Sequence, residues 1–143
     1  MNDSLFASLF MKLEIDRQPN YAVLRIREPY LNFTVGPELR SVIQQITGEG
    51  VTNLVLDMTE VSSADSSGLS AFVAANRICR DQGGILILIH ICLQVEKIIG
   101  LARLEDVLQT AADLAGARAT IEKHHSENRD PAAAERMQRY QYP

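Results

Sequence analysis

The chain has little cysteine and no excess of basic residues, and both deficits exclude broad classes of protein. Cys79 and Cys92 are the only cysteines, and they form no CxxC, zinc-type or redox-type spacing. We expect both to be small core residues of a protein in a reducing compartment. The net charge is −4, and no basic stripe with interleaved aromatic residues is present. These features argue against a disulfide framework and against nucleic acid as a partner.

Long apolar runs and a signal-type N-terminus are also missing. No run approaches the ~20 residues that span a bilayer, and residues 1–10 lack the basic and apolar regions of a signal peptide. The sequence therefore predicts a cytoplasmic protein that does not insert into a membrane. A length of 143 residues, with 46% hydrophobic and 22% charged residues, fits one globular domain whose core needs no metal or disulfide.

Catalytic, metal and nucleotide motifs are absent as well. No Gly-rich phosphate loop occurs, and no His, Asp or Glu group has metal-ligand spacing. A hydrolase could use Ser67 as nucleophile, His90 as base and Asp57 as orienting acid. However, the flanks of Ser67 do not match the Gly-x-Ser-x-Gly turn, and the sequence secures none of the three roles. We expect no enzyme activity, no metal site and no cofactor.

Apolar periodicity predicts an antiparallel hairpin near the N-terminus. Residues 9–16 and 21–26 have strand character and flank the turn residues Pro19 and Asn20. Residues 1–8 are expected to be a frayed lead-in.

The middle of the chain alternates between helices and strands. Residues 51–58 and 85–91 contain nearly continuous apolar runs, which are typical of parallel strands buried on both faces. Helices are expected to begin near residues 35, 67 and 93. This order predicts a single α/β domain with a mixed sheet, in which parallel strands follow the hairpin and helices pack on them.

The C-terminal part is more polar. Residues 104–108 are expected to form a short strand or turn, and residues 111–115 a last helix. We expect the domain to span residues 9–117 and residues 118–143 to be a charged tail, partly disordered or a docked helix. Truncation after about Ala117 is expected to leave a folded core.

The stretch from Asp65 to Leu69, Asp-Ser-Ser-Gly-Leu, joins a predicted strand to a predicted helix. Free backbone N–H groups and the positive end of the helix dipole meet at such a point, which favours an anion. From the residues alone, N-capping by Asp or Ser is the simplest interpretation, and it contributes ~1 kcal/mol.

The segment from Leu54 to Leu69 resembles the signature of the STAS domain, the fold of bacterial anti-sigma factor antagonists. Residues 31–40 resemble the start of the family's first helix, Gly83-Gly84 resembles a turn before its next strand, and residues 95–101 resemble its third helix. The resemblance covers about residues 10–116 and implies a STAS-like α/β domain.

The resemblance also implies a function. In the antagonists the phosphorylated serine is the second of the Asp-Ser-Ser-Gly-Leu motif, which corresponds to Ser67. The unphosphorylated protein would bind an anti-sigma factor serine kinase, phosphorylation would release it, and a PP2C-type phosphatase would reset it. A homodimer is a further possibility. The implied partner-binding residues are Asn32, Asp65, Ser66, Ser67, Gly68 and Leu69.

Elementary chemistry is compatible with such a switch. A phosphate adds a charge of about −1.5 to −2 beside Asp65, which opposes docking by repulsion and desolvation. Gly68 would let a partner backbone approach closely. Asn32 stands where antagonists commonly have Asp, so its bond to a basic partner group would lack charge assistance. The alternative is a STAS module that serves as a scaffold subunit of a signalling assembly or of a membrane transporter, with Ser67 acting only as a cap.

Overall fold

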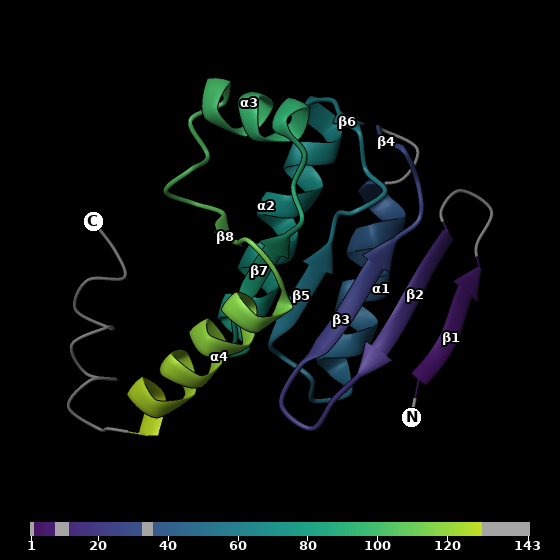
Figure 1. The fold of residues 1–143 in the computed structure, drawn as a ribbon. Helices are drawn as coiled ribbons and strands as arrows, with labels where there is room; N and C mark the ends of the chain where they lie inside the picture. Colours follow the sequence, from purple (N-terminus) through teal and green to yellow (C-terminus); the bar gives the residue numbers. More distant parts are fainter. Residues whose placement is uncertain (1, 8–11, 33–35, 130–143) are drawn as a thin grey trace.

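The structure, a computed structural model, describes residues 2–7, 12–32 and 36–129. Its centre is a six-stranded mixed sheet with the order β1-β2-β3-β5-β7-β8 (Figure 1). β1, β2 and β3 pair antiparallel, and β3, β5, β7 and β8 pair in parallel. This arrangement confirms the predicted hairpin and mixed sheet. The strands are β1 (Asn2–Ala7), β2 (Lys12–Arg17), β3 (Ala22–Ile26), β5 (Leu54–Asp57), β7 (Leu86–Ile89) and β8 (Gln109–Ala111).

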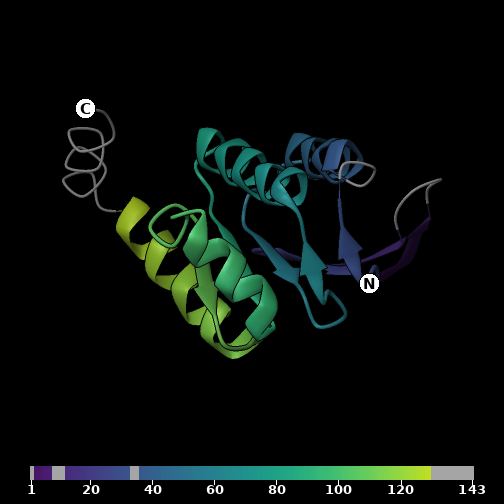
Figure 2. The same ribbon diagram turned by 90° about the horizontal axis from the view of Figure 1, so that it is seen from above.

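Helices cover the sheet on both faces and at one end. The helices α1 (Gly36–Gly48) and α2 (Ser66–Asp81) lie side by side on one face, and α4 (Leu114–Arg129) lies on the other (Figure 2). Helix α3 (Leu93–Leu101) lies beyond the ends at which the parallel strands finish (Figure 1). The predicted helix starts near 35, 67 and 93 are confirmed at residues 36, 66 and 93.

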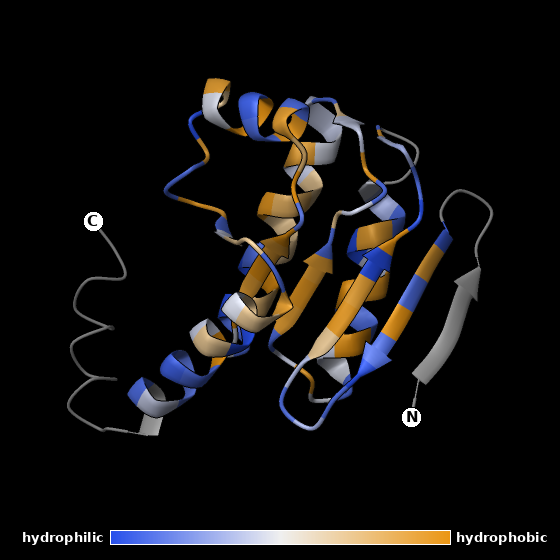
Figure 3. Ribbon diagram, viewed as in Figure 1, coloured by the Kyte–Doolittle hydropathy of each residue, from blue (hydrophilic) through white to orange (hydrophobic). Residues whose placement is uncertain are grey.

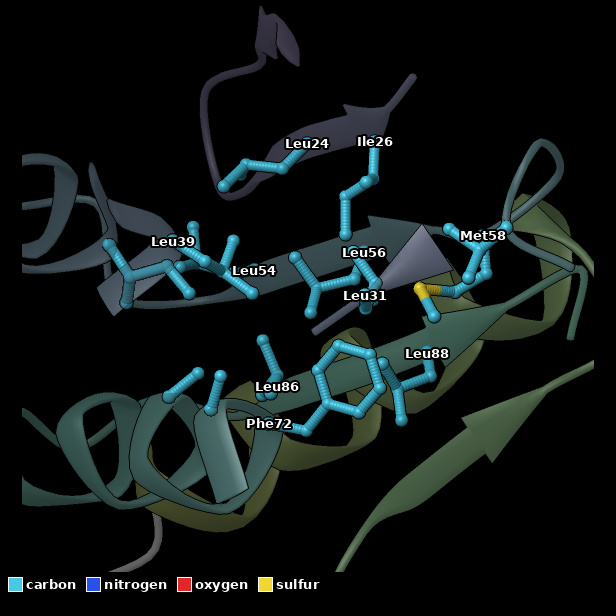
Figure 4. Close-up of a cluster of buried hydrophobic side chains, with 14 of the residues drawn as sticks. Leu24, Ile26, Leu31, Leu39, Leu54, Leu56, Met58, Phe72, Leu86 and Leu88 are labelled. Atoms are coloured by element: carbon cyan, nitrogen blue, oxygen red, sulfur yellow. The ribbon is translucent and has the colours of Figure 1, made fainter. Parts of the chain in front are cut away.

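The main core lies between the sheet and the pair α1 and α2. Strands β5 and β7 are buried along their whole length, as their apolar runs predict (Figure 3). The ring of Phe72 on α2 lies against Leu86 and Leu88, and the aliphatic side chains of β3 and β5 continue the layer (Figure 4). Burial of this apolar area, at ~25 cal/mol per Å², is the main force that holds the helices on the sheet.

Residues 2–7 form strand β1, so the expectation of a frayed lead-in is wrong for them. The strand pairs antiparallel with β2, from Asn2 opposite Asp16 to Ala7 opposite Lys12, with an irregularity between Asp3 and Phe6. Pairing with an existing sheet edge satisfies the backbone even where the sequence does not alternate. Residues 9–11 of the predicted second strand lie outside the described residues.

The C-terminal elements also differ from expectation. Ala111 belongs to β8, and the last helix begins at Leu114 and continues to Arg129 across the expected domain boundary. Ala117 and Ile121 are buried against a second apolar cluster on the sheet. In addition, Nε2 of His124 lies 2.9 Å from the carbonyl oxygen of Gly83 in the turn after α2. Residues 118–129 are therefore a docked helix, and residues 130–143 lie outside the described part of the chain.

A network of ion pairs lies on the same face as α4, but over strands β2, β3 and β5. Arg25 bonds Asp57 and Glu14, each at 3.0 Å. Arg27 pairs with the same Glu14 and, at 2.9 Å, with Glu60. Helix α4 contacts mainly β7 and β8, and its buried side chains share an apolar cluster with Val23 of β3 and Val55 of β5. The ion pairs of Arg25 and Asp57 lie two residues further along these two strands. No helix in the described ranges has the length and apolarity needed to cross a membrane.

Candidate functional site

The loops that follow β3 and β5 are held together at the end of the sheet where those strands finish. Two short strands, β4 (Tyr30–Leu31) and β6 (Ser63–Ala64), pair in parallel between them. The N–H of Asp65 donates to the carbonyl of Leu31 at 3.0 Å, and the N–H of Ser62 donates to that of Pro29 at 2.8 Å. This pairing places Asn32, which follows Leu31, beside the start of α2. The sequence-predicted residues Asn32 and Asp65 are thus brought together.

Asp65 caps helix α2. Its carboxylate accepts hydrogen bonds from the N–H groups of Ser67 and Gly68, at 2.9 and 3.0 Å, and its carbonyl accepts one from Leu69 at 3.0 Å. The capping interpretation is confirmed, with Asp65 as the capping residue. We expected the N–H groups at this helix start to be free for an anion, but those of Ser67, Gly68 and Leu69 already bond Asp65.

Gly68 is buried against the chain's own backbone. A Cβ atom at this position would lie 2.6 Å from the carbonyl oxygen of Leu31 and 3.0 Å from the Leu31 Cβ. The close backbone approach that we expected from a partner is made here by β4. Leu69 is 5% exposed and belongs to the main core. Gly68 and Leu69 therefore hold the start of α2 in place. The residues that a partner could contact are those before them, Asp65 to Ser67.

The three serines near the start of α2 differ in their surroundings. Ser66 and Ser70 are exposed, and the Ser70 hydroxyl donates to the carbonyl of Ser66 at 2.9 Å. Ser67 is half-buried, and its Oγ has no hydrogen-bond partner among the described residues. It lines a groove of about 470 Å³ between α1 and α2. The groove is also lined by Gly36, Pro37, Arg40, Ser41, Gln44, Ser70, Ala71 and Ala74.

Asp57 and His90, the other two members of the hypothetical hydrolase triad, lie away from this groove. The Asp57 carboxylate bonds Arg25 at 3.0 Å and the Thr59 N–H at 3.0 Å, on the sheet face opposite α2. Burial raises the pKa of Asp57, but bonds from Thr59 and Arg25 outweigh it and leave the pKa below its usual value. His90 is exposed, has a φ of +55°, and lines a separate cavity beside α3. Asp57 thus takes part in an ion pair and does not orient a base for Ser67.

The cysteines have different environments. Cys79 is fully buried in the main core, and burial raises the pKa of its thiol to about 12. It is therefore a neutral core residue, as expected. Cys92 is half-buried at the N-cap of α3, with its Sγ 3.6 Å from the carbonyl of Ser62. In the described ranges, no group of three or more His, Cys, Asp or Glu side chains could hold a metal ion.

Sequence reasoning missed two apolar side chains that flank this surface. Tyr30 is 63% exposed on β4, and Leu93 is 67% exposed at the start of α3. Both lie near β6, because Tyr30 pairs with Ser63 and helix α3, which Leu93 begins, contacts β6. In the sequence, a tyrosine in an otherwise polar loop was the signal that could have indicated this exposed apolar site. Exposed aromatic and aliphatic residues at one edge favour contact with another protein.

The sequence profile of one protein family, the STAS domain, matches residues 12–117. No curated protein sequence matches the chain. The fold is similar to that of an anti-sigma factor antagonist from Mycobacterium paratuberculosis, with a TM-score of 0.69, 15% identity, and coverage of 82% of this chain and 99% of that one.

Two other solved structures are similar over comparable parts of this chain. For SpoIIAA, a Bacillus cell fate determinant in its phosphorylated form, the TM-score is 0.59 at 18% identity, with 76% of this chain and 98% of that one covered. For the murine anion transporter Slc26a9 it is 0.64 at 21% identity, with 76% of this chain but only 18% of the transporter covered. At such identities the likeness concerns the fold.

Proposed function

Because the chain belongs to the STAS domain family, we propose that it is a regulatory protein that switches partners through phosphorylation of Ser67. It has the fold of the anti-sigma factor antagonists. In the proposed cycle, the unphosphorylated protein binds an anti-sigma factor serine kinase in the cytoplasm. Phosphorylation releases it, and a PP2C-type phosphatase restores the binding form.

The observation that carries the proposal is the position of Ser67. Ser67 lines a surface groove, and its hydroxyl has no hydrogen-bond partner among the described residues, so adding a phosphate breaks no such bond. The α2 cap stays in place because it depends on Asp65. A phosphate at this position therefore changes the surface that a partner meets while the domain stays folded.

The contact surface in this proposal comprises Asn32, Asp65, Ser66 and Ser67, with Tyr30 and Leu93 as apolar neighbours. Gly68 and Leu69 contribute indirectly, because they fix the start of α2 against β4 and the core. The protein acts by binding and the kinase supplies the chemistry, so neither a cofactor nor an enzyme activity of its own is required.

A scaffold subunit is the second candidate. The specific observation is the likeness to part of an anion transporter that is much longer than this chain. A scaffold requires partner binding but no change at Ser67. The two candidates therefore differ in whether the serine is modified.

The test uses the full chain and the serine kinase that it captures from its own organism. Ser67→Ala should bind the kinase as the wild type does and incorporate no phosphate from ATP. Ser67→Asp should bind at least about tenfold more weakly, since a misplaced charge in an interface costs several kcal/mol. Both variants should melt near the wild-type temperature, because the Asp65 cap remains.

Ser66→Ala is the matched control, since Ser66 is exposed one residue earlier. It should still accept phosphate. If Ser66→Ala blocks phosphorylation and Ser67→Ala does not, the modified residue is misassigned. If kinases bind but modify neither serine, the scaffold candidate replaces the switch.

A further inference from the structure

The groove beside Ser67 contains a cation with no acidic partner in the described part of the chain. Arg40 of α1 is the only charged residue among those lining the groove. It is exposed and forms no ion pair with another described residue. We propose that this groove is an internal receptor for the phosphate on Ser67, with Arg40 as its cation. The inference rests on the proposed function, because it concerns the same serine.

The start of α2 offers the phosphate few N–H groups of its own. A helix N-terminus usually stabilises an anion through its free N–H groups. In this chain the N–H groups of Ser67 and Gly68 already donate to the Asp65 carboxylate, and that carboxylate also repels a second anion. A phosphate of charge about −2 on Ser67 must therefore find other donors. The groove that Ser67 lines contains such donors.

The packing of α1 against α2 places Arg40 within reach of that phosphate. Gly36 marks the register, because a Cβ atom there would lie 3.4 Å from the carbonyl oxygen of Ser67 and 3.6 Å from the Cβ of Ala71. Arg40 follows Gly36 by one helical turn and lies on the same side of α1. Helical side chains lean toward the N-terminus of their helix, so Arg40 leans back toward the level of Ser67.

The groove has room and further donors for the anion. Gly36, Ala71 and Ala74 line it with small or absent side chains, and its volume is about 470 Å³. Ser41 and Gln44, on the same helix as Arg40, also line it and carry groups that can donate to phosphate oxygens. Arginine binds phosphate through two parallel N–H···O bonds, a geometry that lysine cannot reproduce.

This arrangement gives phosphorylation two effects on a partner. The phosphate presents charge, and it also fills a groove that is open in the unmodified protein. A carboxylate at residue 67 is shorter and carries a single charge, so it should engage Arg40 more weakly. We therefore expect Ser67→Asp to release a partner less completely than phosphoserine does.

The test places phosphoserine at residue 67 during synthesis of the full chain, so that no kinase is needed. The second pKa of the phosphate, near 6 in a free phosphoserine, is then measured by ³¹P NMR. Asp65 raises this pKa, whereas Arg40 and the N-terminal ends of α1 and α2 lower it. Only the change in the phosphate pKa when Arg40 is replaced reports on the proposed contact.

In Arg40→Gln the phosphate pKa should rise by about 0.5 or more relative to the wild-type background. Arg40→Lys should give an intermediate value, because it keeps the charge but not the paired bonds. Arg77→Gln is the matched control, since Arg77 is exposed on α2 and does not line the groove. It should leave the phosphate pKa unchanged.

An equal phosphate pKa in the wild-type and Arg40→Gln backgrounds, with both proteins folded by circular dichroism, overturns the proposal. The two hypotheses fail separately. If a kinase never modifies Ser67 but Arg40→Gln raises the phosphate pKa, the switch is wrong and the receptor stands. If the kinase modifies Ser67 and the pKa does not respond to Arg40, the receptor is wrong and the switch stands.

Discussion

Gly68 offers a sharp test of how the start of α2 is positioned. In Gly68→Ala, the new methyl group would lie 2.6 Å from the carbonyl oxygen of Leu31, well inside van der Waals contact. The obstructing atoms belong to backbone that is itself fixed, because the same carbonyl accepts a hydrogen bond from Asp65. Neither side can move away without disturbing the pairing of β4 with β6.

The expected cost follows from this rigidity. Overpacking a well-filled site typically costs 1–3 kcal/mol. We expect about 2–3 kcal/mol for Gly68→Ala, because the contact is with backbone and not with the end of a flexible side chain. The helix propensity of alanine would offset less than about 1 kcal/mol of this.

Two other glycines turn the substitution into a graded series. A Cβ atom at Gly48, the last residue of α1, has no neighbour within 4 Å, whereas one at Gly84 would lie 1.9 Å from the carbonyl oxygen of Thr52. The free energy of unfolding in urea should therefore fall in the order Gly48→Ala, Gly68→Ala, Gly84→Ala, with no loss for the first. If Gly68→Ala is as stable as Gly48→Ala, the close contact with Leu31 does not exist in solution.

Two further substitutions test the two halves of the sheet face that carries α4. Asp57→Asn should lower stability by about 1 kcal/mol at pH 7. Because the pKa of Asp57 is lowered in the folded protein, this stabilisation is present above the usual aspartate pKa, near 4, and is lost as the pH falls through the lower pKa of the folded state. Equal losses in urea unfolding at pH 7 and pH 2 would contradict this assignment. Ile121→Ala should cost about 2 kcal/mol because Ile121, on the sheet-facing side of α4, is 3% exposed, whereas Arg118→Ala on the exposed side should stay within about 0.5 kcal/mol. Wild-type stability of Ile121→Ala in urea would show that α4 does not dock.

The elements that the sequence predicted well are those whose signals are local. The run Leu54-Val55-Leu56 predicts a buried strand, and the polar residues from Asp65 predict a helix start, without reference to the rest of the chain. Strand β1 was missed because residues 2–7 do not alternate, and only an existing edge at β2 gives them partners. The docking of α4 was left open because few apolar residues, chiefly Ala117 and Ile121, hold it.

The candidate site also combines features with a local signal and features that depend on distant residues. The motif from Asp65 to Leu69 identified the correct turn, and it correctly suggested a cap. The reason for Gly68 depends on Leu31, which lies far away in the sequence, and the place of Arg40 depends on the register between two helices. Neither relation leaves a pattern in a single sequence, because both are set by packing of the finished fold.

The ion pairs of Glu14, Arg25 and Asp57 restrict how two copies of this chain could associate. These residues occupy three neighbouring strands, and Arg25 and Asp57 lie two residues beyond Val23 and Val55, which pack in one apolar cluster with α4. A second copy lying flat on them would have to strip water from an arginine and two carboxylates, at several kcal/mol for each ion. These ion pairs therefore oppose dimerisation through this part of the sheet, because their charges are more stable in contact with water. Self-association is expected to use a different side of the molecule.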